Sequence, residues 1–343
     1  MTRAALWLHV LLGVAALGFA WQSAHQVKAK NGGPSSVVLL DADKGEVVDV
    51  LYTWDKGSTH TTLEGKAKAR SAVVDVDREV PAKKETPKKK DPHEPDEAPT
   101  APEPTATPAD RDKATLPGGK SVLTAIEALE PFKTKRTLGV VDEAKLEAMG
   151  LKTPLRSLVV KTARGKTLTL DVGEQSYGAQ GRYARVRGDN VVHLIDAAIA
   201  TGLEGGSDAL LEKRLLTAEL ESIRGFSLKA GAATGGWVHV DKDQATKRFF
   251  AKSDDLSAKD DPAGKLMTTL RNLRATKLAS ADTKSTALAA AFVVDVDGQP
   301  VTIEIFERGT GDGQLARVGR WVFELSATQS KELLGDIDAA LGS

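Results

Sequence analysis

The sequence predicts an antiparallel α+β protein in which one unit of strands and helices occurs twice. Residues 183–186, followed by 191–194 and a helix start, recur as 315–318, followed by 321–325 and a helix start. Both copies run in the order strands, helix, strands, helix, with short links that leave no room for the long crossovers of a parallel sheet. Because each copy of a repeat is one supersecondary unit, the duplication sets the architecture before any single residue is interpreted.

In the first copy, hydrophobic periodicity predicts two helices among the strands. The first helix covers 121–129, and the second covers 197–203 after Asp196, a short polar residue suited to an N-cap. The strand-like runs are 47–54, 59–63, 72–77, 157–162 and 167–172.

The second copy has the same order. Its helices are expected at 265–273 and 332–341, and Ser326 with Gln329 forms a capping box ahead of the latter. Asp297-Gly298 is a strong hairpin dipeptide between two of its strands. The strand-like runs are 223–229, 236–241, 291–296 and 301–306.

The amino-terminal end predicts a membrane segment. Residues 4–21 are apolar apart from one histidine, and Trp7 and Trp21 lie near the two ends of this run. A cleavable signal peptide is the alternative, since Gly18-Phe19-Ala20 is an acceptable cleavage site. We expect an anchor over 1–26, a first repeat over 37–205 and a second over 206–343, with one membrane pass in the inner membrane and the bulk of the chain in the periplasm.

The overall charge is balanced, with 47 Lys and Arg against 47 Asp and Glu. This excludes a general electrostatic attraction to nucleic acid. The local exception is the Lys-, Pro- and Glu-rich segment 81–117, which has almost nothing apolar to bury and is expected to be a disordered insertion in the first repeat. The chain has no cysteine, which fits an exported protein and a reduced compartment equally.

No residues are predicted as catalytic, cofactor-binding or metal-binding. The six histidines show no i, i+4 pairing, and the glycine-rich segment 309–313 lies between strands, where a hairpin loop is favoured over a phosphate loop. The Asp-rich segments 41–45 and 295–298 lack the remaining ligands of a calcium loop, and turns are favoured there. Asp254-Asp255 and Asp260-Asp261 are expected in a solvated loop.

Four residues are candidate contacts to a partner. Arg185 and Arg317 occupy equivalent positions in the two copies, where each could pair with a carboxylate inside its own unit or bind one on a partner. Phe249 and Phe250 lie in a basic stretch, and in an extended chain one ring would pack on the core while the other meets solvent or a partner. A structural role is favoured for both pairs.

Several of these features together resemble a known family. They are the run Gly-Arg-Tyr-Ala-Arg-Val at 181–186, Ala-Met-Gly-Leu at 148–151 with Thr153-Pro154, and Leu-Glu-Lys-Arg-Leu-Leu at 211–216. With the amino-terminal segment and the duplication, they resemble domain of unknown function 4340, a family of bacterial membrane-anchored proteins often encoded beside gliding-motility-type ABC transporter subunits. The resemblance covers roughly 47–341 outside the insertion and brings no catalytic residues.

The resemblance implies a non-enzymatic accessory or scaffold subunit of an ABC-type transporter or a gliding-motility-related envelope complex. Its expected partners are the membrane, through the amino-terminal helix, and proteins of that complex, with no nucleic acid and no cofactor. Two alternatives stay open. One is an envelope glycan-binding module, for which Trp237 and Trp321 are the candidate aromatic platform. The other is a hydrolase whose triad is assembled only by the fold.

Overall fold

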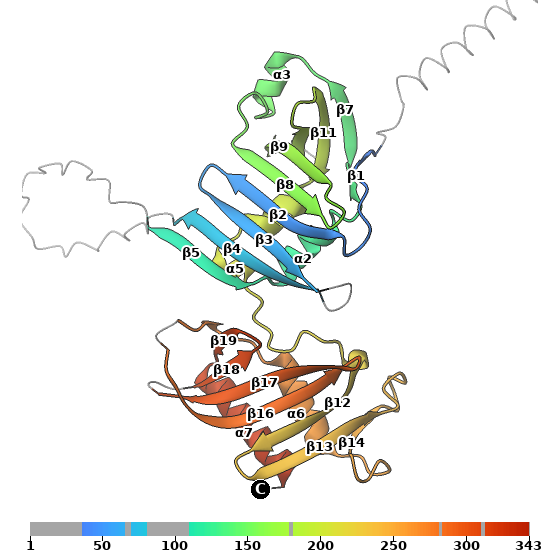
Figure 1. The fold of residues 1–343 in the computed structure, drawn as a ribbon, viewed down its shortest axis with the longest axis vertical. Helices are drawn as coiled ribbons and strands as arrows, with labels where there is room; N and C mark the ends of the chain where they lie inside the picture. The colour runs from blue at the N-terminus through green and yellow to red at the C-terminus, as the bar shows by residue number, and fades with distance from the viewer. Residues whose placement is uncertain are drawn as a thin grey trace, which may run out of the picture. The chain divides into compact units, whose positions relative to one another are not determined.

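The structure is a computed structural model that describes residues 36–65, 70–80, 110–177, 181–280, 283–309 and 313–342. The chain divides into two compact units (Figure 1). Unit 1 contains residues up to 55 together with 125–201, and unit 2 contains 56–124 together with 202 onward.

The elements of the first predicted repeat are mostly strands. They are β1 (Val38–Leu40), β2 (Val47–Trp54), β3 (Gly57–Glu64), β4 (Ser71–Glu79), β5 (Arg111–Pro117), α2 (Lys120–Glu127), β6 (Phe132–Lys133), β7 (Arg136–Val140), α3 (Glu143–Ala148), β8 (Arg156–Thr162), β9 (Thr167–Gln175), β10 (Gly181–Val186), β11 (Val191–Asp196) and α4 (Ala197–Leu203).

The elements of the second predicted repeat include the two longest helices of the described chain. They are α5 (Ser207–Leu210), the 3₁₀ turn η2 (Leu220–Ser222), β12 (Ile223–Ala230), β13 (Ala233–Val240), β14 (Phe249–Lys252), α6 (Asp261–Asn272), β15 (Lys277–Leu278), β16 (Ser285–Val296), β17 (Gln299–Arg308), β18 (Gln314–Val318), β19 (Trp321–Glu324) and α7 (Ala327–Leu341).

Hydrogen bonding groups the described strands into three sheets. A nine-stranded sheet has the order β5-β4-β3-β2-β8-β9-β10-β11-β7, an eight-stranded sheet has the order β14-β13-β12-β16-β17-β18-β19-β15, and β1 pairs with β6. Neighbouring strands pair antiparallel in unit 1, as β2 with β8 does, and in unit 2, as β16 with β17 does. The fold is therefore antiparallel α+β, as predicted, with more strand than helix.

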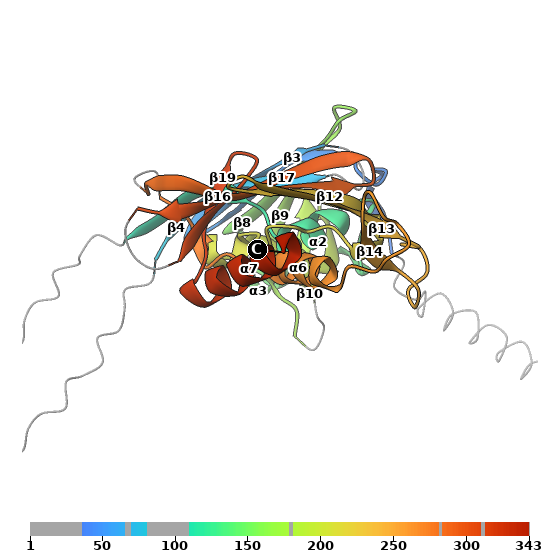
Figure 2. The same cartoon turned by 90° about the horizontal axis from the view of Figure 1, so that it is seen from below.

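The eight-stranded sheet of unit 2 carries both long helices on one face. Figure 2 shows α6 and α7 together below the sheet, while none of the described helices of this part of the chain lies on its other face. The aromatic rings on the helix side pack closely, since Phe226 stacks on Trp237 at 4.8 Å between ring centroids and meets Phe250 edge-on at 5.5 Å. Leu266 and Leu333, one from each helix, are fully buried. This apolar layer is the core of the carboxy-terminal part of unit 2.

Local sequence explains how several elements begin and turn. Asp297 and Gly298 both adopt positive φ, 51° and 87°, as a tight hairpin between β16 and β17 requires. The Ser326 side chain accepts a hydrogen bond from the Gln329 backbone N–H at the start of α7, and the Asp196 carboxylate accepts one from Ala198 at 2.9 Å. The hairpin and the two N-caps are confirmed. Of the predicted capping box, the Ser326 half is formed, and the Gln329 side-chain oxygen accepts from the Ser326 hydroxyl at 3.1 Å.

The structure corrects the predicted insertion and some boundaries. Residues 111–117 form β5, which pairs with β4, so this end of the predicted disordered segment is an ordered strand; residues 81–109 lie outside the described chain. The prediction failed because β5 is polar on its solvent side and needs a neighbouring strand to be stable. The two long helices α6 and α7 begin four and five residues earlier than predicted, at Asp261 and Ala327.

The predicted membrane segment, residues 4–21, also lies outside the described residues. Within the part of the chain that the structure describes, none of the helices combines the length and the apolar character needed to cross a bilayer.

Candidate functional site

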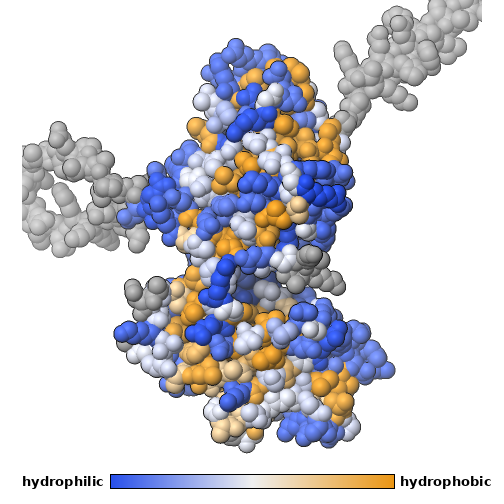
Figure 3. All heavy atoms as spheres, viewed as in Figure 1, coloured by the Kyte–Doolittle hydropathy of each residue, from blue (hydrophilic) through white to orange (hydrophobic). Residues whose placement is uncertain are grey.

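The face of the eight-stranded sheet opposite α6 and α7, here called the open face, exposes apolar side chains. Val238, Val293 and Leu288 are 36%, 40% and 47% exposed. Strand register places them on one face. Val238 lies opposite Gly225, which lies opposite Asp295, two residues along β16 from Val293. Val293 and Leu288 lie opposite Thr302 and Phe306, which are four residues apart on β17. Figure 3 shows hydrophobic residues on this face of β16 and β17.

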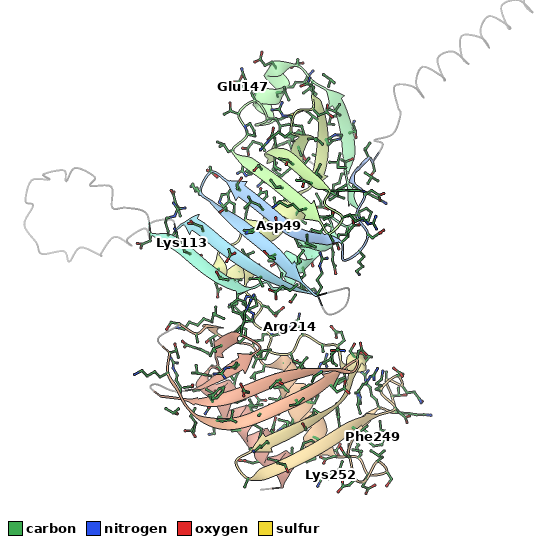
Figure 4. The ribbon with its side chains drawn as sticks, viewed as in Figure 1. Asp49, Lys113, Glu147, Arg214, Phe249 and Lys252 are labelled. Atoms are coloured by element: carbon green, nitrogen blue, oxygen red, sulfur yellow. The ribbon has the colours of Figure 1, made fainter. Side chains whose placement is uncertain are left out.

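Phe249 and Phe250 separate onto the two faces of the sheet at its edge strand, β14. Phe250 is buried and stacks on the His239 ring at 4.5 Å, on the helix side. Phe249 lies opposite Val240 and is only half-buried, and the alternation of β14 places it on the open face with Val238 (Figure 4). Of the two predicted rings, only Phe249 is therefore available to a partner.

Arg185 and Arg317 both form ion pairs with a carboxylate on the preceding strand. Arg185 Nε lies 3.3 Å from the buried carboxylate of Asp171, which also receives Arg187 Nε at 3.0 Å. Arg317 Nη1 lies 3.2 Å from Glu304, and that carboxylate is about a third exposed. The two arginines were predicted to be equivalent but differ in setting, since Arg317 lines an opening in the surface and Arg185 pairs with a buried carboxylate.

That opening is a pocket of about 260 Å³ at one end of the open face, formed by β17, β18, β19 and the segment before β16. Its lining includes Phe306, Leu315, Arg317, Arg320 and Trp321, of which Leu315 is fully buried. The Arg317 guanidinium lies 4.6 Å from the centre of the Phe306 ring, and that of Arg320 lies 4.8 Å from the centre of the Trp321 ring. Both cations are thus held beside aromatic rings.

Trp237, the other predicted aromatic platform, is not on the surface. It is 3% exposed, and its indole Nε1 donates to Asp260 Oδ2 at 2.8 Å. Asp260 also caps α6 by accepting from the Ala263 backbone N–H. The acidic loop prediction is corrected here, because Asp260 is an N-cap and a core contact rather than a solvated charge.

Burial perturbs two histidines, one in each unit. Desolvation lowers the pKa of His193 below its ordinary value, although the Asp189 charge raises it in part. Desolvation also lowers the pKa of His239, against a raising effect of its 2.9 Å hydrogen bond to the Ile223 carbonyl. His193 Nδ1 shares a 3.1 Å hydrogen bond with the Thr137 hydroxyl, and His239 Nδ1 lies 2.9 Å from the Ile223 carbonyl oxygen.

The acidic and glycine-rich segments act as turns. Gly298 N–H donates to Asp295 at 2.7 Å, and Ser257 donates to Asp255 from both its backbone and its hydroxyl. Strands β17 and β18 pair antiparallel on either side of the glycine-rich segment, of which 310–312 lie outside the description. Over the described residues, no group of three or more His, Cys, Asp or Glu is arranged to hold a metal ion.

The fold is an antiparallel α+β fold whose accessible features include the open sheet face and the opening beside Trp321. A family model described as Domain of unknown function (DUF4340) matches residues 100–291, more than half of the chain, and the protein belongs to that family. The match runs from before β5 into β16. No curated protein matches the chain, and no solved structure does.

Sequence reasoning missed the pocket as a site. Its residues come from 278–280, Thr283, Ser285 and the strands β17, β18 and β19. Sequence reasoning considered Arg317 as a carboxylate partner and Trp321 as an aromatic platform, but neither as part of a pocket. Arg320 had one available signal, its place between Gly319 and Trp321 in the turn that joins β18 to β19.

Proposed function

We propose that this protein is a non-enzymatic accessory or scaffold subunit of an ABC-type transporter or a gliding-motility-related envelope complex. In this proposal the amino-terminal segment anchors it in the inner membrane and the duplicated α+β portion works outside the cytoplasm. The resemblance at 148–151, 181–186 and 211–216 suggests this setting.

The observation that carries the proposal is the open face. Three large aliphatic side chains, Val238, Leu288 and Val293, are exposed on one side of a sheet whose other side is covered by helices. Phe249 adds a half-buried ring at the edge of the same face. A large exposed apolar patch typically marks a protein interface, and in this proposal these four side chains contribute to one; an aromatic residue often contributes a large part of the binding energy.

The proposed repeat is supported by the sheet orders. The nine-stranded sheet contains the order β4-β3-β2-β8-β9-β10-β11-β7, and the eight-stranded sheet has the order β14-β13-β12-β16-β17-β18-β19-β15. The two orders correspond position by position when the strands are matched by their place in the chain before and after α2 and α6. Strand β5 is one additional edge strand. Arg185 on β10 then corresponds to Arg317 on β18, and each pairs with the strand before it.

Affinity purification of the full-length protein from native membranes tests the partner. We expect transporter or envelope subunits to co-purify with the unchanged protein, and their yield to fall in the Phe249→Ala variant, because an interface ring is lost. Leu256→Ala is the matched control, since Leu256 is 51% exposed and lies in a turn outside the sheet. Equal yield from both variants, with equal melting temperatures, would remove the open face from the proposal.

Protease treatment of cells with a permeabilised outer barrier tests the topology. The chain should be digested from outside down to a short membrane stub. Complete protection would reverse the proposed orientation, and recovery of the chain in the soluble fraction would support cleavage after Ala20.

A further inference from the structure

The first part of β16 has a neighbouring strand on one side only. Strand β12 pairs with the second part of β16, and this pairing ends where Lys229 lies opposite Ala291. On the other side, β17 continues along β16 as far as the pair of Ser285 and Arg308. Residues 285–289 therefore form a free edge of the eight-stranded sheet, here called the β16 edge. In the proposed repeat the counterpart β8 has no such edge, because β2 pairs with it over almost its whole length.

The backbone of the β16 edge is available for strand pairing. In an antiparallel ladder, alternate residues direct both the N–H and the C=O group away from the neighbouring strand. In the described chain, no backbone hydrogen bond outside the β16–β17 ladder involves residues 285–289. The first four of these residues are exposed, and the fifth is half-buried. At about 3.3 Å per residue the edge is about 17 Å long, which suits one short added strand.

The side chains of the β16 edge are small or apolar and carry no charge. The stretch reads Ser-Thr-Ala-Leu-Ala, and its Leu288 is 47% exposed beside Phe306 of β17. A residue directly opposite Leu288 in an added strand would lie on the same face and cover it. Ala287 and Ala289 occupy little space, so larger side chains of the added strand fit beside them. An uncharged segment with apolar side chains therefore fits the centre of the edge.

Two lysines lie at the ends of the β16 edge. Lys284 immediately precedes it, and Lys229 ends the β12 pairing at its other end. Both are exposed, and neither forms an ion pair with a carboxylate of the described residues. Along the middle of the edge, β17 carries the exposed Glu307, whereas Arg308 is paired with Glu324. Acidic residues of an occupant are therefore favoured at its two ends and disfavoured in its centre.

The same lysines argue against a second copy of this chain as the occupant. If two such edges paired antiparallel, Lys284 of one copy would approach Lys229 of the other, and edge lysines typically prevent such pairing. The β16–β17 register is also irregular on both sides of Leu288, as at β-bulges, which bend an edge. A flexible segment can follow this bend, whereas the edge of a second folded sheet cannot.

We propose that the β16 edge binds an extended segment of a partner protein by strand addition. The segment continues the line of β12, antiparallel to β16, with uncharged and apolar residues in its centre and acidic residues at both ends. Main-chain hydrogen bonds supply the affinity, and Leu288, Lys229 and Lys284 supply the specificity. The inference does not rest on the proposed transporter or envelope complex, and Phe249 on β14 is separated from β16 by β13 and β12.

Fluorescence anisotropy with the purified full-length protein tests the chemistry with a labelled peptide, Glu-Glu-Thr-Val-Thr-Val-Thr-Glu-Glu. We expect saturable binding, and binding at least about tenfold weaker when lysines replace the glutamates. The same peptide N-methylated at its five central residues should also bind at least about tenfold more weakly, because it cannot donate to the edge. No saturable binding, or equal affinity of the N-methylated peptide, would overturn strand addition. Equal affinity of the lysine peptide would overturn the acidic partner.

Hydrogen exchange and variants locate the site. The bound peptide should slow amide exchange in residues 285–289, and unchanged exchange there would overturn the site. The double variant Lys229→Glu/Lys284→Glu should bind the lysine peptide more tightly than the glutamate peptide. Lys247→Glu is the matched control and should keep the original preference, since Lys247 is an exposed lysine in the turn before β14.

An unchanged preference in the folded double variant would overturn the proposed role of the two lysines. Phe249→Ala should leave the affinity for the glutamate peptide unchanged, because Phe249 lies outside the β16 edge. A loss of affinity in that variant would place the peptide elsewhere and overturn the site. The peptide measurements therefore stand or fall separately from the co-purification of transporter or envelope subunits.

Discussion

At the residue scale, the burial of the partner carboxylate determines how much the free energy of unfolding falls when Arg185 or Arg317 is replaced. Asp171 is buried and is held by Arg185 and Arg187, whereas Glu304 is about a third exposed and reaches water when Arg317 is removed. A buried carboxylate that loses a partner keeps its desolvation penalty, while an exposed one recovers hydration. The same substitution should therefore have unequal effects at the two sites.

We expect Arg185→Met to lower the free energy of unfolding by about 2 kcal/mol, since Arg187 still compensates part of the Asp171 charge. Arg317→Met should cost less than about 1 kcal/mol. Urea unfolding of the two variants, followed by far-UV circular dichroism, measures the difference. A larger loss for Arg317→Met would contradict the burial argument.

The buried histidines make stability depend on pH. Burial lowers the pKa of His193 and of His239 below the ordinary 6.5, so between that value and the lower folded pKa the unfolded chain binds more protons than the folded one. Stability then rises with pH in this window and falls as the pH drops below about 6.5.

Urea midpoints measured from pH 7.5 down to 5 should decrease, and the decrease should be shallower in His193→Gln and in His239→Gln. Glutamine is uncharged at every pH, so each variant lacks the proton uptake of the replaced histidine on unfolding. The comparison is of slopes within each variant, because the substitutions also change stability at neutral pH. Parallel curves for all three proteins would exclude the two histidines as the cause.

At the element scale, one carboxylate, that of Asp260, links the start of α6 to a side chain of the sheet. Asp260 accepts from Ala263 N–H at 2.9 Å through Oδ1 and from the Trp237 indole at 2.8 Å through Oδ2. One oxygen caps the helix and the other satisfies a buried donor of the core. The position of α6 on the sheet and the start of the helix therefore depend on the same side chain.

Substitutions of Asp260 should lower the free energy of unfolding by different amounts. Asp260→Ala loses the cap, about 1 kcal/mol, and leaves the buried indole N–H without a partner, a further 1–3 kcal/mol or so. Asp260→Asn keeps one acceptor oxygen and should cost less. In a Trp237→Phe background the cost of Asp260→Ala should shrink to about that of the cap, which a double-mutant cycle measures. An unchanged cost in that background would show that the indole bond contributes nothing.

At the scale of the whole molecule, the eight-stranded sheet is complete within the second predicted repeat. Its strands run from Ile223 in β12 to Glu324 in β19, and the helices that cover it, α6 and α7, lie between Asp261 and Leu341. All its strand pairs and both helices thus come from residues 206–343, which contain one apolar core. A segment of this length with its own core is of the size of an independent domain.

We expect the fragment 206–343 to fold alone and to unfold in one cooperative urea transition with the far-UV circular dichroism of an α+β protein. The full chain is the control, and its unfolding should contain a transition at a similar midpoint. A gradual, non-cooperative loss of signal from the fragment would place the boundary of the second repeat elsewhere.

Much of this fold was predictable because local chemistry specifies it. The strand 47–54 was predicted with the bounds that β2 has, Asp297-Gly298 forms its hairpin, and Asp196 and Ser326 cap α4 and α7. The missed elements are those with weak local signals. Strand β5 is mostly polar, and β15 has only two residues, so each depends on pairing with a strand elsewhere in the chain.

The sequence by itself determined the antiparallel α+β class, the turns and the helix caps, because these follow from interactions between residues a few positions apart. It also placed two phenylalanines on opposite faces of an extended segment. Only the tertiary structure decided which face is covered, because alternation with a period of two is the same whichever side the helices occupy. That choice buries Phe250 and leaves Phe249 on the open face, and it brings Arg317, Arg320 and Trp321 around one pocket from positions whose local sequences carry no ligand signal.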